Sequence, residues 1–154
     1  MTPTAEMTLG PFFPREFAEG VNDLAGNASD ALEITGRVTE LEGRPLDNVI
    51  LEVWQPEFAG WGRAATDAKG EYRFRIRRPG AIPGRAPHVN FLILYSGLMR
   101  QLQTTLFFSS ASDPVLEAVE PGRRALLVAR PEGKSAFRFD IRLRGMDETP
   151  FFDD

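Results

Sequence analysis

The spacing of apolar and polar residues predicts a chain built mainly of β-strands. Residues 32–38, 72–77 and 137–144 alternate apolar with polar side chains, so one face of each strand points to a core and the other to water. Residues 49–54 and 89–95 are apolar over most of their length, which is typical of strands buried on both faces. Further strands are predicted at residues 102–108 and 125–130.

Turn and helix signals separate these segments. Residues 67–70 (DAKG) have the composition of a hairpin loop, and the chain carries 14 glycines and 12 prolines, more than a helical bundle tolerates. Ser112-Asp113-Pro114 predicts the start of one short helix. The predicted fold class is therefore all-β, an antiparallel β-sandwich of about seven or eight strands with one short helix.

The first 31 residues differ from the rest because they show no sustained period. They hold Phe12, Phe13 and Phe17 among several prolines and glycines. We expect an extended N-terminal arm over residues 1–31, followed by a single sandwich domain over residues 32–154. Such an apolar arm should lie on a surface, and the pattern leaves open whether that surface belongs to its own domain or to a partner.

Charge and composition restrict the partners. The net charge of −4 argues against a general binder of nucleic acid or of anionic membranes, since both need clustered positive charge. No apolar run reaches the roughly 18 residues of a membrane span, and residues 1–10 lack a secretory signal pattern. A cytoplasmic location is the resulting expectation.

Few residues are available for metal or nucleophilic chemistry. The chain has no cysteine and one histidine, His88, so a thiolate site or a two-histidine site cannot be built from it. Phosphate-binding glycine loops are missing, and no carboxylate pair stands out among the 22 acidic residues. The arginines at 73–77 and 138–144 predict solvated faces balanced by nearby acidic residues rather than an anion site.

Several motifs, taken in order, carry a family resemblance over residues 7–153. Together they resemble the intradiol ring-cleavage dioxygenases, and most of all the alpha-type chain of the two-chain members. The motifs are TLGPF at 8–12, LEVWQ at 51–55, GR at 62–63, TD at 66–67, GEY at 70–72, RPG at 78–80, RAPHVN at 85–90, FRFDI at 137–141 and ETPFFD at 148–153.

The resemblance implies a β-sandwich and a ferric ion held by two tyrosines and two histidines, which binds a catechol that oxygen then opens. This chain departs from the ligand pattern. The histidine pair reads His88-Val89-Asn90, Ile82 stands where one tyrosine would fall, and the segment that carries the other tyrosine is missing before Gly62. Arg85 takes the place of a charge-stabilising arginine. We therefore expect Ile82, Arg85, His88 and Asn90 to form a vestigial iron site, with no metal ligand set and no catalytic residue in this chain.

By the same resemblance, the chain would be the non-catalytic alpha-type subunit of a heteromeric intradiol dioxygenase. A homologous beta subunit would hold the Fe(III), with a catechol-type substrate such as protocatechuate at the interface. Thr8, Gly10, Pro11 and Phe12 would form part of the substrate-pocket wall, although Phe12 stands where such arms commonly have a tyrosine. Two alternatives remain: a free-standing β-sandwich binding module with no catalytic partner, and an isolated enzyme with a carboxylate metal site.

Overall fold

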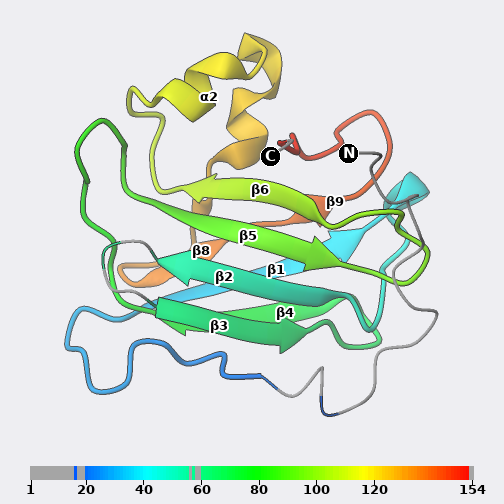
Figure 1. Ribbon diagram of the computed structural model, residues 1–154, viewed down its shortest axis with the longest axis horizontal. Helices are drawn as coiled ribbons and strands as arrows, with labels where there is room; N and C mark the ends of the chain where they lie inside the picture. The colour runs from blue at the N-terminus through cyan, green and yellow to red at the C-terminus, as the bar shows by residue number, and fades with distance from the viewer. Residues whose placement is uncertain (1–15, 17–19, 56, 58–59, 153–154) are drawn as a thin grey trace, which may run out of the picture.

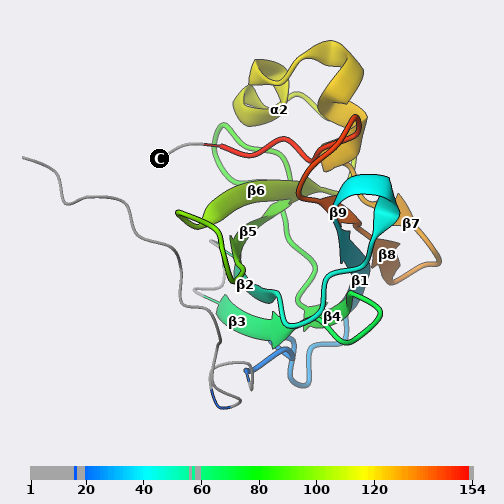
Figure 2. The same ribbon diagram turned by 90° about the vertical axis from the view of Figure 1, so that its right-hand side faces the viewer.

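Two β-sheets lie face to face and enclose the core. The computed structural model describes residues 16, 20–55, 57 and 60–152. Figure 2 shows the two layers edge-on, one formed by β3, β2, β5 and β6 and the other by β4, β1, β8 and β7, with β9 beside β1. The strands are β1 (Leu32–Thr39), β2 (Ile50–Gln55), β3 (Gly60–Ala65), β4 (Glu71–Ile76), β5 (His88–Leu94), β6 (Leu102–Phe107), β7 (Arg130–Pro131), β8 (Ala136–Arg138) and β9 (Ile141–Arg142).

The core fills the space between the sheets with side chains from alternate strand positions. In β1 the buried positions are every second residue, as the alternation predicts. Phe91 of β5 lies at the centre, with its ring centroid 6.1 Å from Phe74 and 6.0 Å from Tyr72 in edge-to-face geometry. The β-sandwich prediction is confirmed.

Strand β1 is the centre of its sheet. It pairs antiparallel with β4 on one side and parallel with β8 and β9 on the other. The parallel pairing is a departure from a purely antiparallel sandwich. Gly36 allows the segment between β8 and β9 to come close to β1, because a Cβ atom there would collide with the Phe139 carbonyl oxygen.

The alternating run at 137–144 does not form one long strand, as the sequence predicted, but splits into β8 and β9. Between them, Phe139 points into the core and its N–H donates to the Thr35 carbonyl, while the Asp140 carboxylate accepts the N–H of Arg37. The side chain of Asp140 thus replaces a backbone acceptor at this point of the ladder. The side chains still alternate in direction across the break, because the chain continues along β1 in the same direction.

Helical segments close one end of the sandwich, beyond β6 (Figure 1). They are the α-helix α2 (Pro114–Ala118) and the 3-10 helix η3 (Pro121–Leu127). Another short 3-10 helix, η1 (Leu41–Gly43), follows β1. The predicted helix start at Asp113 is confirmed, since its side chain accepts the N–H of Val115 as an N-cap. The predicted strand at 125–130 is wrong, because η3 occupies its first half and β7 begins only at Arg130. Leu127 and Leu116 instead pack with Phe107 in a second apolar cluster.

The structure of two further segments, β3 and residues 20–31, was not predicted from the sequence. Strand β3 was missed, since its sequence GWGRAA contains two glycines and no alternation of large apolar side chains. Residues 20–31 follow the surface of the sandwich: the Arg63 N–H donates to the Val21 carbonyl, the Leu24 N–H donates to the Arg75 carbonyl, and Ala25 is buried. No helix in the described ranges is long and apolar enough to cross a membrane.

Candidate functional site

The residues of the vestigial site lie on β5 and on the loop that leads into it. His88 and Asn90 are two apart on β5, so they share the face of the sheet that points away from the core. His88 pairs across to Phe107, and Asn90 lies between Thr105 of β6 and Trp54 of β2. Ile82 and Arg85 face each other across a tight turn, in which the Arg85 N–H donates to the Ile82 carbonyl. Arg85 and Asn90 line one pocket, whose described lining includes neither Ile82 nor His88.

His88 is buried, with 2% of its surface exposed. Its Nδ1 lies 2.7 Å from the Ala86 carbonyl oxygen. Because a carbonyl only accepts, Nδ1 carries the proton, and Nε2 keeps its lone pair. Nε2 is buried and has no hydrogen-bond partner among the described residues. The Ala86 contact holds the ring, whose centroid lies 6.1 Å from that of Phe107.

Asp113 is the residue that organises the loop, although the sequence marked it only as a helix start. Its side chain is fully buried, and Oδ2 accepts from Arg85 Nε at 2.8 Å and from the Ala86 N–H at 2.9 Å. Burial alone would raise the pKa of Asp113, but the hydrogen bonds from Arg85, Ala86 and Val115 outweigh it and hold that pKa below its usual value. Asp113 therefore joins the loop before β5 to the start of α2 as an anion.

A pocket opens beside this pair. It has a volume of about 410 Å³ and lies between the outer face of the sheet and the first turn of α2. Arg85, Asn90 and Thr105 supply its polar surface, and its apolar surface includes Val115 and Phe152. Asn90 Oδ1 accepts from the Thr105 hydroxyl at 3.0 Å, so the two polar residues at its base already contact each other.

The residues present do not fit a ferric ion. His88 Nε2 offers one imidazole lone pair, but Ile82 has no donor atom and the Asn90 oxygen is taken by Thr105. Tyr72 is buried in the core, where its hydroxyl donates to the Phe139 carbonyl at 2.5 Å and burial raises its pKa well above the usual value. In the described part of the chain, no group of three or more histidine, cysteine or acidic side chains could hold a metal.

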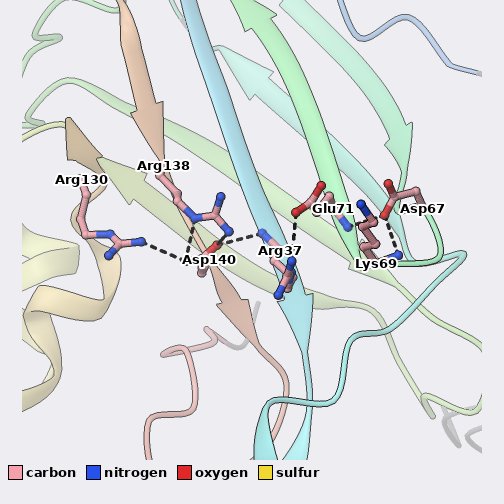
Figure 3. A network of polar contacts seen from close by, with 7 residues as sticks. All are labelled: Arg37, Asp67, Lys69, Glu71, Arg130, Arg138 and Asp140. Atoms are coloured by element: carbon pink, nitrogen blue, oxygen red, sulfur yellow. Dashed lines mark hydrogen bonds and ion pairs between the residues drawn. The ribbon is translucent and has the colours of Figure 1, made fainter. Parts of the chain in front are cut away.

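The arginine-rich strand faces are balanced by acidic side chains, as the sequence predicted. Figure 3 shows Asp140 between Arg130 and Arg138, with Arg37 reaching Glu71 on the neighbouring strand. Asp140 raises the pKa of Arg138 chiefly through this hydrogen bond. These charges are paired with one another, which favours a solvated ionic surface over an anion site.

An exposed aromatic pair lies on the same outer face as the pocket. The Trp54 and Trp61 rings are 6.4 Å apart and leave 49% and 36% of their surfaces exposed. The Arg63 guanidinium lies 5.0 Å from the centre of the Trp61 ring and pairs with Glu52. Asn90 is paired with Trp54 on one neighbouring strand and with Thr105 on the other, so this aromatic surface extends to the edge of the pocket.

The four predicted arm residues, Thr8, Gly10, Pro11 and Phe12, lie outside the described residues.

Comparisons with known proteins agree with this architecture. No family model matches the chain. In sequence it is 31% identical to the protocatechuate 3,4-dioxygenase beta chain of Burkholderia cepacia, over 97% of this chain and 84% of that one. It is 35% identical to the protocatechuate 3,4-dioxygenase alpha chain of Pseudomonas putida, over 78% of this chain and 74% of that one.

Solved structures give the same result. The dioxygenase domain of a dioxygenase–carbohydrate-binding protein fusion from Streptomyces sp. SirexAA-E superposes with a TM-score of 0.64 at 26% identity, covering 94% of this chain and all of that domain. Hydroxyquinol 1,2-dioxygenase from Pseudomonas putida DLL-E4 has the same fold, with a TM-score of 0.60 over 93% of this chain and 67% of that one. The chain belongs to the intradiol ring-cleavage dioxygenase family. Its relatives include both the alpha and the beta chains of protocatechuate 3,4-dioxygenase.

Proposed function

We propose that this chain is the non-catalytic alpha-type subunit of a heteromeric protocatechuate 3,4-dioxygenase and acts in the cytoplasm. The observation that carries the proposal is the candidate iron site, where His88 Nε2 is the one side-chain nitrogen with a lone pair for a metal among Ile82, Arg85, His88 and Asn90. A ferric centre of this family needs four protein ligands, so the iron would reside in a homologous beta subunit.

The exposed aromatic surface supports a partner on this face. Large aromatic side chains are enriched at the centres of protein interfaces, and an exposed tryptophan pair is unusual on a free sheet face. Trp54 and Trp61 point outward from β2 and β3, next to the pocket. A beta subunit docked here would bring its own iron site close to this chain. By resemblance, Thr8, Gly10, Pro11 and Phe12 would then form part of the substrate-pocket wall.

Co-expression with a beta chain tests the proposal. The complex should cleave protocatechuate between its hydroxyl-bearing carbons with about one iron per pair, and neither activity nor stoichiometric iron should accompany this chain alone. Oxygen uptake, product absorbance and iron analysis are the measurements. Iron bound one to one by the isolated chain, or a catechol cleaved by it, would contradict the proposal.

A pair of substitutions tests the docking face. Trp54→Glu places a charge at the centre of the aromatic surface and should abolish co-purification of the two chains. Met146→Glu is the matched control, because Met146 is fully exposed in the loop after β9. Both variants should fold, as judged by circular dichroism. If Trp54→Glu still forms the active complex, the partner binds at another face of the chain. If the wild type forms no complex at all, a monomeric module without partner becomes the better account.

A further inference from the structure

The chain enters its described part beside the aromatic surface of Trp54 and Trp61. Gly20 lies directly against β3, since an added Cβ atom there would be 2.5 Å from the Cβ atom of Arg63. The next carbonyl, that of Val21, accepts the Arg63 N–H at 3.0 Å. Arg63 and Trp61 are two apart on β3, so they share its outer face, and the guanidinium lies over the indole ring. The residues before Gly20 therefore start at the edge of the aromatic surface.

This entry point is held in place by both sheets. On the β4 side, the Leu24 N–H donates to the Arg75 carbonyl at 2.7 Å, and the Arg75 N–H donates to the Asn22 carbonyl at 2.8 Å. The Asp23 carboxylate binds the Arg75 guanidinium. On the β3 side, the Leu24 side chain occupies the space next to Gly62, where a Cβ atom would collide with it. The origin of the preceding segment is thus fixed relative to the tryptophans.

The segment that starts from this point carries apolar side chains within reach of the surface. Residues 11–17 read PFFPREF. Phe17 stands three residues before Gly20, which allows a reach of about 10 Å, whereas Trp61 is only about 7 Å along the strand from Arg63. The other two phenylalanines have a longer reach. The two prolines beside them restrict the backbone, which lowers the entropy that docking would cost.

The aromatic surface offers what such a segment needs. Trp54 and Trp61 leave 49% and 36% of their surfaces exposed, and aromatic rings pack favourably against one another. A short tether also gives a roughly millimolar effective concentration, so even a weak contact is populated. We infer that in the isolated chain residues 12–17 dock on this surface, with their three phenylalanines against the indole rings. The contact lies within one chain, so it does not rest on the proposed subunit role, and a partner on this face would have to displace it.

Tryptophan fluorescence of the isolated full chain tests this inference. The chain has two tryptophans, and both lie in the aromatic surface, so emission and quenching by acrylamide report this surface alone. Replacing the three phenylalanines together (Phe12→Ser, Phe13→Ser, Phe17→Ser) should move the emission to longer wavelength. The quenching constant should rise about two-fold or more, which corresponds to a contact populated at least half of the time.

A matched control removes an apolar side chain from another exposed place. Leu41→Ser in η1, where Leu41 is 44% exposed, should be quenched as the wild type is. Circular dichroism should show that all variants keep the fold. Equal quenching of the triple variant and the wild type would overturn the inference.

The state of association separates docking within one chain from docking between copies. The wild type should be a monomer in analytical ultracentrifugation, and its protection from quenching should not change on about ten-fold dilution, because a contact within one chain does not depend on concentration. Protection that is lost on dilution, or a wild-type dimer that the triple substitution dissociates, would assign the contact to a second copy and contradict the inference.

Discussion

Two of the carboxylates that hold arginines in this chain, Asp113 and Asp140, differ in burial. Asp113 is fully buried and fixes Arg85 together with two backbone N–H groups. Asp140 leaves 45% of its side chain exposed and shares its oxygens between Arg130 and Arg138 (Figure 3). The charges of the exposed cluster pair with one another, and solvent screens the electrostatic interaction between them. The Asp113 carboxylate is closed off from solvent, so the pair depends on each of its hydrogen bonds, and Arg85 Nη2 has no partner among the described residues.

Removal of the buried carboxylate should have the largest effect. Asp113→Ala leaves the charge of Arg85 and the N–H groups of Ala86 and Val115 without their acceptor. We expect a loss of about 3–5 kcal/mol in the free energy of unfolding, which is usual when one partner of a buried pair is removed. Urea denaturation measures it. Asp147→Ala, which breaks an exposed pair with Arg142, is the control and should cost less than about 1 kcal/mol.

Acid should destabilise the wild type by protonating Asp113, whereas a variant with a neutral side chain at this position has no carboxylate to protonate. The pKa of Asp113 is lowered in the folded chain from a usual value of 3.8, so its stabilisation is complete above 3.8 and is lost as pH falls through the folded pKa. Asp113→Asn cannot titrate. The variant should be less stable than the wild type by roughly 2–3 kcal/mol near neutral pH. Unfolding followed from neutral pH to well below 3.8 should show this gap narrowing, and a constant gap would show that ionised Asp113 does not stabilise the fold.

The exposed cluster should give the smallest effect. Asp140→Asn removes the charge that pairs with Arg130 and Arg138 but keeps an oxygen for the Arg37 N–H. The expected loss is below about 1 kcal/mol, and it should fall further with added salt, because exposed pairs are screened. Unfolding free energies measured at low and high ionic strength check it. A loss comparable with that of Asp113→Ala would remove the contrast between the two clusters.

Most of the fold follows from the sequence, because buried strands impose a visible period. The alternation in β1 and β4 and the apolar runs of β2 and β5 predict elements that the structure contains. The failures have local causes. Strand β3 carries small residues on its buried positions, so it shows no apolar period. Residues 125–129 are apolar, and Leu127 of η3 packs against Phe107, but an apolar run this short does not distinguish a strand from a helical turn.

The candidate site was less predictable than the fold. Its loop and strand positions could be named from motifs, and Arg85 and Asn90 indeed line one pocket. Asp113 lies 28 positions beyond Arg85 in the chain, and nothing in the local sequence links the two. Only the folded chain brings the start of α2 against the loop before β5. A buried aspartate is recognisable from sequence as a helix cap, but its second role depends on that tertiary contact.

The central position of β1 has a consequence for synthesis of the chain. One edge of β1 can pair as soon as β4 has been made, whereas the other edge waits for residues 136–142 near the end. Contacts this distant in sequence are slow to form. Until they do, a nascent or truncated chain presents one open strand edge, to which another chain can add. Translation that stops before β8 should therefore yield aggregates rather than a smaller sandwich.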